Sequence, residues 1–291
     1  MLEKPCTPLP PSMNDSGKGA ATTLRLCLYN KPTKTKKSPA ASELEAENEN
    51  FYKVFACAVS LIVLGMGKTV CEEPHDYPRS VAVGDIIYTD GTISSKDAGL
   101  TSGKTPVAVV AGFNKNGAIL GLGLKKSSSL RWAPENTTGY STKFTGIIAY
   151  SDIKGPKSFG SNATITGDTD GSDNWEYVKS IDPEGTAKAE KNYPAFNYAA
   201  TYATTAGITG DIAEGWYMPS IAELRELYKV RKILNGSLAK CGGTTFMDAS
   251  YWSSSQYDDD NSAAWRFNFE RNNLDRITKY SSIYVCCVRA F

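Results

Sequence analysis

The segment YWSSSQYDDDNSAAWRFNF, residues 251–269, places aromatic side chains on both sides of a run of small acidic and amide residues. In its second half, Trp265 and Phe267 alternate with Arg266 and Asn268. Because successive side chains of a β-strand point to opposite faces, this period of two predicts a strand with one face in the core and the other in solvent. By composition alone, the DDDNS run is typical of a solvated loop.

Two β-hairpins are predicted upstream of this segment. The stretches VAVGDIIYTDGTISS and TPVAVVAGFNKNGAILGLGLKK each contain two short apolar runs, joined at Asp90-Gly91 and at Asn116-Gly117. Such dipeptides accept the positive φ angles of a tight turn, so each stretch is expected to fold back on itself as a pair of strands.

Two helices are predicted between the hairpins and the C-terminal strands. NYPAFNYAATYATTAG has apolar residues at helical spacing and stops at Gly207, a common C-terminal residue of helices. YMPSIAELRELYKVRKILNG begins with Ser220 and Glu223 in a capping box and is expected to end at Asn235-Gly236. The apolar stripe of this second helix consists of Ile221, Leu224, Leu227 and Tyr228.

The chain ends in another apolar stretch, SIYVCCVRAF, which is expected to be a strand with one of Cys286 and Cys287 pointing inward. Two helices set among hairpins, with strands near both ends of the domain, predict an α+β fold.

Composition excludes several classes of function. Lysine plus arginine (32) nearly equals aspartate plus glutamate (31), so the overall charge does not favour nucleic acid or polycationic partners. Seven cysteines and one histidine, His75, show no spacing typical of a zinc site or a disulfide scaffold. Neither a metal nor a cofactor is therefore expected.

The sequence divides into three parts. Residues 1–50 are rich in Pro, Ser, Lys and Glu, and we expect them to be disordered. Residues 51–74 contain an apolar run, 54–67, with the length of a signal-peptide core and a cysteine, Cys71, close behind it. This run is interpreted as an export signal or lipoprotein anchor, with a buried strand or helix as the alternative. Residues 75–291 form the predicted folded domain.

Five motifs in a fixed order resemble the variable proteins of diversity-generating retroelements, of the type found in Treponema. They are VGDIIYTDGTISS, GWYMPSIAELRELY, YWSSSQY, AWRFNF and YVCCVRAF, and together they span roughly residues 80–291. The resemblance implies a C-type lectin fold of the variety shared with formylglycine-generating enzymes. It also implies that adenines in the codons of the terminal segment, chiefly asparagine codons, are mutated to vary a ligand-binding surface.

The resemblance assigns residues 251–291 to a changeable surface and a fixed frame. Mutating the adenines of an asparagine codon does not produce Trp, Gln, Lys, Met or Glu, so Trp252, Gln256, Trp265 and Lys279 belong to the frame, together with Phe267 and Phe269 as buried aromatic residues. The expected ligand-binding residues are Asp258, Asp259, Asp260, Asn261, Ser262, Arg266, Asn268, Arg271, Asn272, Asp275, Arg276, Tyr280, Ser281, Ser282, Ile283 and Cys286. One solvent-facing patch is expected to contain Arg266, Asn268, Asp275, Arg276 and Tyr280, with residues 258–262 beside them.

Two other classes of function compete with a binding protein. A formylglycine-generating-like enzyme would use a pair of cysteines, and Cys241, Cys286 and Cys287 lie near the C-terminus. However, adjacent cysteines of a regular strand cannot face one cleft, and no histidine follows His75 to act as a general base. The second alternative is a purely structural outer-membrane lipoprotein.

The sequence therefore predicts a non-enzymatic protein on the bacterial cell surface or outer membrane. Its partner is expected to be an unidentified protein or surface ligand and not a nucleic acid, with membrane association through a lipid anchor. Because export permits disulfides, Cys241 and Cys287 are a candidate pair by position alone.

Overall fold

The structure is a computed structural model that describes residues 80–152 and 160–291, all of which belong to a single unit of the chain. The segments expected to be disordered (1–50) or signal-like (51–74) lie outside these residues, as does His75.

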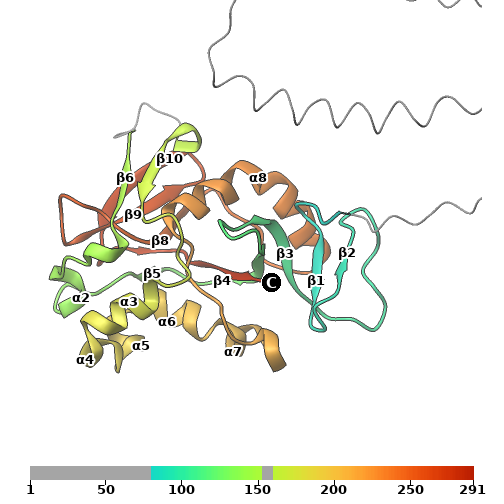
Figure 1. Cartoon of the computed structure of the whole chain (residues 1–291), viewed down its shortest axis with the longest axis horizontal. Helices are drawn as coiled ribbons and strands as arrows, with labels where there is room; N and C mark the ends of the chain where they lie inside the picture. The colour runs from blue at the N-terminus through green and yellow to red at the C-terminus, as the bar shows by residue number, and fades with distance from the viewer. Residues whose placement is uncertain (1–79, 153–159) are drawn as a thin grey trace, which may run out of the picture. The chain divides into compact units, whose positions relative to one another are not determined.

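Antiparallel pairing organises the described strands into four sheets (Figure 1). The largest has the order β12-β4-β3-β1-β2, where β1 is Ile86–Tyr88, β2 Ile93–Ser94, β3 Pro106–Phe113, β4 Ile119–Lys126 and β12 Cys286–Ala290. A three-stranded sheet has the order β10-β9-β8, where β8 is Ser250–Gln256, β9 Ala263–Asn268 and β10 Asn273–Thr278. Two short pairs join β5 (Leu130–Arg131) to β11 (Ser282–Ile283) and β6 (Ala149–Ser151) to β7 (Ile165–Gly167).

The helices lie on two sides of these strands (Figure 1). The long helix α8, Ile221–Lys240, covers one side. Short helices gather on the other: α2 (Thr138–Ser141), α3 (Asn174–Ile181), α4 (Pro183–Thr186), α5 (Ala189–Asn192), α6 (Pro194–Ala200) and α7 (Tyr202–Ala206). Short 3₁₀ turns occur at Thr145–Ile147, Gly160–Asn162 and Gly210–Ile212. No helix within the described ranges combines the length and apolarity needed to cross a bilayer.

Two hydrophobic cores occupy opposite faces of the sheets. The first, called the α8 core, contains Val109, Leu122, Leu224, Leu227, Tyr251, Trp265, Phe267 and Val288. The second, called the aromatic core, contains Ala108, Val110, Trp132, Phe144, Tyr193, Phe196, Trp252 and Val285. Because side chains alternate along a strand, neighbours such as Val109 and Val110 enter different cores. Both faces of the central strands are thus buried.

The two predicted hairpins are present. In the first, β1 pairs with β2, and Gly91 in their turn has φ 77°. In the second, β3 pairs with β4, and Gly117 has φ 79°. The positive φ angles explain the glycine at both turns, because other residues enter this region at a conformational cost.

Helix α8 begins where the sequence predicts but ends later. The Ser220 hydroxyl accepts from the Glu223 N–H at 3.3 Å, and the Glu223 carboxylate accepts from the Ser220 N–H at 2.8 Å, which is the predicted capping box. The expected end at Asn235-Gly236 is wrong, because the helix continues to Lys240. Leu234 and Leu238 are both fully buried, so packing on each side of Gly236 overrides its low helix propensity.

The α+β class is confirmed, but the described residues contain more helices than the two that the sequence predicts. The stretch 192–207 begins at the last residue of α5 and then folds as α6 and α7, which are separated at Thr201; α7 stops at Gly207 as predicted. Helices α2 to α5 were not predicted, because four to eight residues are too few for an apolar period to stand out.

A glycine substitution tests the packing account of α8. Gly236 is exposed within the helix, and a Cβ added there meets no atom within 4 Å. We expect Gly236→Ala to raise the free energy of unfolding by about 0.5–1 kcal/mol, by reducing the entropy of the unfolded chain. Gly207→Ala is the control: its Cβ is equally unobstructed, but φ is 69°, so a loss of about 1 kcal/mol is expected. Urea unfolding measures both, and a loss in Gly236→Ala would contradict the account.

Candidate functional site

The three-stranded sheet β8-β9-β10 carries most of the segment predicted to bind ligand. All the expected frame residues are buried: Trp252, Gln256, Trp265, Phe267, Phe269 and Lys279. The indole N–H of Trp265 donates to the Ala149 carbonyl at 2.9 Å, and that of Trp252 donates to the Leu130 carbonyl at 2.9 Å. The two tryptophans thereby tie β9 and β8 to segments more than one hundred positions away in the sequence.

The frame occupies both faces of this sheet, not one. Trp265 and Phe267 enter the α8 core, as the alternation predicts, and Arg266 and Asn268 on the other face are half-buried. Trp252, however, lies in the aromatic core and is the cross-strand neighbour of Arg266. A buried tryptophan and an expected ligand-binding residue therefore share one face, because only the outer part of that face is open to solvent.

The serines of WSSSQ form a buried polar network that the sequence did not reveal. The Ser253 hydroxyl donates to the Trp265 carbonyl at 2.8 Å. The Ser255 hydroxyl donates to Asp168 at 2.6 Å, and the Asn174 amide donates to Ser254 at 2.7 Å. Burial raises the pKa of Asp168 to about 6. A serine run is typical of loops, and only the tertiary partners show that this one is a core strand.

The predicted ligand-binding residues on β9 and β10 point to opposite sides. The Arg266 guanidinium lies 3.5 Å from the Asp275 carboxylate and donates to the Ser250 hydroxyl at 2.7 Å. Arg276 is instead the cross-strand neighbour of Trp265, and its guanidinium lies 4.9 Å from the ring of Tyr257. The expectation that Asp275 and Arg276 lie on one patch is therefore wrong, since adjacent residues of a strand face opposite ways.

The run 258–262 is a turn at one end of this sheet, with its middle residues, Asp259, Asp260 and Asn261, exposed. The Asp260 carboxylate accepts from the Ser262 hydroxyl at 2.6 Å and from its N–H at 2.9 Å, and these bonds lower the pKa of Asp260. Asp258 forms an ion pair with Lys143 at 3.2 Å. The predicted solvated loop is present, and its backbone is held in place.

The turn between β9 and β10 includes a residue with a structural role. Asn272 has φ 50° and exchanges hydrogen bonds of 2.9 Å with Ser161, through its carbonyl oxygen and its amide nitrogen. The Asn268 side chain accepts from the Arg271 N–H at 2.9 Å, and Arg271 is exposed. Asn272 thus contributes to packing against residues 160–162, which the prediction did not include.

Lys279 is the most unusual member of the frame because its side chain is fully buried. Its ammonium group donates to the carbonyls of Gly139 at 2.8 Å and Thr142 at 3.2 Å, and to the Gln256 side chain at 3.2 Å. The ring of Trp132 lies 4.4 Å from the same nitrogen. Burial lowers the pKa of Lys279 to about 7, against a weaker opposing effect of Asp260.

The backbone of Lys279 connects three segments around the proposed surface. Its N–H donates to the Ser262 carbonyl at 2.7 Å, which fixes the end of the 258–262 turn. Its carbonyl accepts from the N–H groups of Trp132 at 2.9 Å and Ala133 at 3.1 Å. Tyr280 follows directly, so the position of Tyr280 is set by a buried residue.

Residues 280–283 lie beside a polar hollow. Tyr280 is 42% exposed, and Ser282 pairs with Arg131 across the β5 and β11 strands. The hollow has a volume of about 530 Å³ and is lined by Arg131, Pro134, Glu135, Asn136, Thr137, Lys191, Asn192 and Tyr280. Ser281 is half-buried and bonds to Thr278 at the base of the turn, and Ile283 is half-buried.

Cys286 does not belong to the surface. It is fully buried in the α8 core, and Cys287 is fully buried in the aromatic core, so both point inward and not just one. Burial raises the pKa of each thiol. Cys241, Cys286 and Cys287 are all free, so the candidate disulfide between Cys241 and Cys287 is absent. Position in the sequence does not show which core a side chain enters, so it does not predict which cysteines pair.

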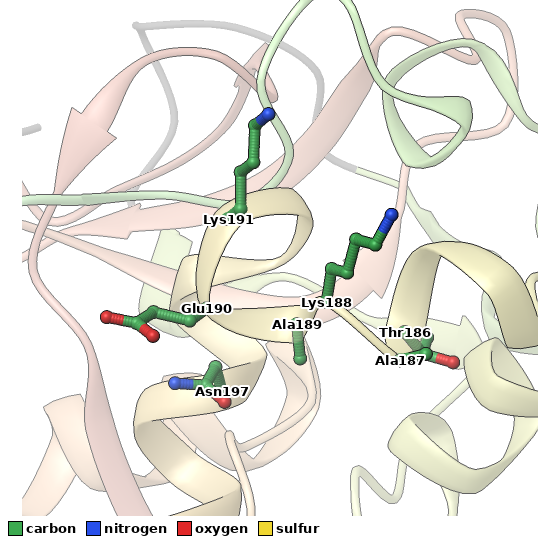
Figure 2. A pocket seen from close by; sticks show the side chains of 7 residues that line it. All are labelled: Thr186, Ala187, Lys188, Ala189, Glu190, Lys191 and Asn197. Carbon is green, nitrogen blue, oxygen red and sulfur yellow. The ribbon is translucent and has the colours of Figure 1, made fainter.

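Another hollow, of about 730 Å³, lies on α4 to α6 and includes no residue of 251–291 (Figure 2). Its lining consists of Thr186, Ala187, Lys188, Ala189, Glu190, Lys191 and Asn197. A third, of about 340 Å³, contains Asp168, Asp170, Asp173 and Lys115, with Asp170 and Lys115 paired at 3.1 Å. Within residues 80–152 and 160–291, no three His, Cys, Asp or Glu side chains are arranged so that they could hold a metal ion together.

Comparisons with known proteins found a matching family model and a similar fold. The family model described as the Lcl C-terminal domain matches residues 126–289. A fimbrial protein from Bacteroides ovatus ATCC 8483 has a similar fold, with a TM-score of 0.52 and 17% sequence identity. The likeness covers 72% of this chain and 49% of that one, so this chain spans about half the length of the fimbrial protein. No curated protein matches the chain.

Two variants separate the contribution of the frame to stability from that of the surface turn. Trp265→Ala should lower the free energy of unfolding by about 3–5 kcal/mol, because it leaves a large cavity in the α8 core. Replacing Asp258, Asp259 and Asp260 together by serine should change it by no more than about 1 kcal/mol, since the lost ion pair is a surface one. Denaturant unfolding provides the measurement. A triple variant as unstable as Trp265→Ala would show that the aspartates are structural.

The buried ammonium group predicts a pH effect with a definite sign. Because the pKa of Lys279 is about 7 in the folded state and near 10.4 in the unfolded state, the unfolded chain binds more protons between these values. Stability should therefore rise with pH above about 7, by on the order of 1–2 kcal/mol up to pH 8.5. Lys279→Met should remove this rise. The free energy of unfolding of both proteins is measured with urea as a function of pH, and the difference between the two curves cancels the contributions of the other titratable groups. If the stability of the parent protein and that of Lys279→Met changed with pH in parallel, the lowered pKa of Lys279 would be contradicted.

Proposed function

Because the chain belongs to the Lcl C-terminal domain family, we propose that it is a surface-exposed ligand-binding protein whose changeable contact residues lie within 251–291. The proposal rests mainly on one observation: the frame residues of this segment are buried, whereas every expected ligand-binding residue except Cys286 is at least partly exposed. A scaffold that keeps its core while its surface changes needs this separation.

The contact surface that we propose follows turns and a strand edge. It comprises the turn 258–262, the outer part of β9 and β10 with Arg266 and Asp275, and residues 280–283. Lys279 joins the first and last of these parts by its backbone, and hydrogen bonds hold each part in place. Preorganisation favours binding, because little conformational entropy is lost when a ligand docks.

Three finer features are part of the proposal. We propose that the fold is the C-type lectin variety shared with formylglycine-generating enzymes, that a retroelement diversifies residues 251–291, and that a lipid anchor holds the protein at the cell surface. The similarity of fold to a fimbrial protein is compatible with a surface location. A near-copy of this segment in the genome, with asparagine codons at the changeable positions beside a reverse transcriptase gene, would establish the retroelement link.

A binding role is favoured over the enzyme alternative. An enzyme with two cysteines would need both thiols in one cleft, but Cys286 and Cys287 are buried in different cores, and burial raises both pKa values. Buried thiols with raised pKa values are poor nucleophiles. A purely structural lipoprotein is the remaining alternative, and a selection experiment distinguishes it from a binding protein.

The selection compares two display libraries of equal size, panned against one set of purified surface proteins. The first randomises the proposed surface at Asp259, Asn261, Arg266, Asp275, Tyr280 and Ser282. The matched control randomises exposed residues of α8 at Glu226, Lys229, Lys232, Ile233, Ala239 and Lys240. We expect folded binders from the first library at a frequency at least tenfold higher. Equal frequencies would show that the segment 251–291 has no special binding role.

A further inference from the structure

We propose that the hollow beside Tyr280 binds a carboxylate side chain of a protein ligand, with Arg131 and Lys191 as the cationic anchors. This inference rests on the proposed function and specifies the ligand chemistry at one part of that surface. The hollow has a volume of about 530 Å³, which is within the size range of small-molecule and side-chain sites.

Three separate elements build the hollow. Arg131 comes from β5, Lys191 and Asn192 come from the end of α5, and Tyr280 comes from the proposed contact segment. Residues 134–137 complete the lining. Figure 2 shows the Lys191 side chain extending away from Glu190 and Asn197, the acidic and amide residues of the neighbouring hollow.

The charges of the lining favour a carboxylate. Arg131 and Lys191 are exposed, and within residues 80–152 and 160–291 their side chains form neither an ion pair nor a hydrogen bond. Several other cations of the domain form ion pairs, such as Arg266 with Asp275 and Lys229 with Glu226. Two unpaired cations at one hollow can each form a charge-assisted hydrogen bond to an acidic group.

The lining also argues against a dense polyanion as the ligand. Glu135 lines the same hollow, so its formal charge is only one positive unit, from two cations and one carboxylate. The whole chain is nearly neutral, with 32 basic and 31 acidic residues. A polyanion would be repelled by Glu135, and the hollow offers only two cations to offset that repulsion. One or two carboxylates of a protein ligand can bind the cations without approaching Glu135.

The walls of the hollow are held by hydrogen bonds before any ligand binds. The Thr137 hydroxyl donates to the Pro134 carbonyl at 2.6 Å, and the Asn192 amide donates to the Gly185 carbonyl at 3.0 Å. The Trp132 N–H donates to the Lys279 carbonyl at 2.9 Å. Because Trp132 follows Arg131 and Lys279 precedes Tyr280, this bond connects the backbone segments that carry Arg131 and Tyr280. Little ordering is therefore required when an acidic group binds.

In this arrangement, one set of residues provides affinity for a carboxylate and another set provides specificity for the ligand around it. Arg131 and Lys191 lie outside residues 251–291, so variation of that segment leaves the anchors in place. Tyr280 and Ser282 lie beside the anchors and inside the segment, since Ser282 pairs with Arg131. Different variants would thus share a carboxylate anchor and differ in what surrounds it.

The test uses NMR titration of the full chain with two blocked pentapeptides that differ only in having carboxylate or carboxamide side chains. We expect saturable shifts of the Tyr280 and Lys191 amides with the acidic peptide, and at least tenfold weaker binding of the amide peptide. Arg131→Gln combined with Lys191→Gln should weaken binding of the acidic peptide at least tenfold. Lys229→Gln combined with Lys232→Gln, which removes the same charge from α8, should leave it unchanged.

Several outcomes would overturn the inference. Equal affinity for the two peptides, or undiminished binding by the Arg131→Gln and Lys191→Gln variant, would show that no carboxylate is recognised there. Binding of dextran sulfate without binding of the acidic peptide would identify a polyanion site instead. Both anchors are exposed, so the double variant should keep the parent melting temperature, which is measured alongside.

Failure of this inference is distinguishable from failure of the proposed function. If binders selected from the surface library keep their affinity when Arg131 and Lys191 are replaced by glutamine, the carboxylate anchor is refuted and the binding function stands. If no binders are selected but the acidic peptide shifts Tyr280 saturably, the anchor stands and the variable-surface function is refuted.

Discussion

Burial of both faces of the central strands is the constraint on which the rest of the structure depends. Because α8 covers one face and the short helices cover the other, side chains of β8, β9 and β12 enter two different cores. The solvent-accessible parts of the terminal segment are therefore its turns, the short strand β11, the outer strand β10 and the half-buried Arg266 and Asn268 of β9. A ligand-binding surface on this fold has to be built from edges and not from an open sheet face, which explains why the proposed contact residues lie in separate short stretches.

Doubly covered strands also place polar groups in the interior, where each needs a partner. The serines of β8 bond to Asp168, Asn174 and the Trp265 carbonyl, and Lys279 donates to three oxygen atoms. An unpaired polar group in such a site would lower the free energy of unfolding by about 1–3 kcal/mol. Each hydrogen bond therefore favours one strand register and one position of the loop that supplies the partner. Hydrophobic burial stabilises the domain, and this network specifies where the surface turns lie.

The sequence predicted the local features and missed the long-range ones. The hairpin turns, the capping box of Ser220 and the alternation around Trp265 depend on neighbouring residues, and the structure contains all of them. The end of α8, the buried Ser254 and the opposite directions of Cys286 and Cys287 depend on which elements pack nearby. The frame position of Lys279 was available only through the family resemblance, because a lone lysine shows no period that would indicate its burial.

The same constraint limits how freely the surface can vary. Asn272 has φ 50°, a conformation that asparagine adopts more readily than most residues and that costs others about 1–2 kcal/mol. Its bonds to Ser161 add to that restriction, and Arg266 is similarly engaged with Ser250 and Asp275. Tyr280 is exposed and has an ordinary backbone conformation, so it can change at little cost to the fold. In the diversification that we propose, codon chemistry sets the outer limit of variation. Backbone geometry narrows that limit unevenly, with most freedom at the exposed positions that neither strain nor buried bonds restrict.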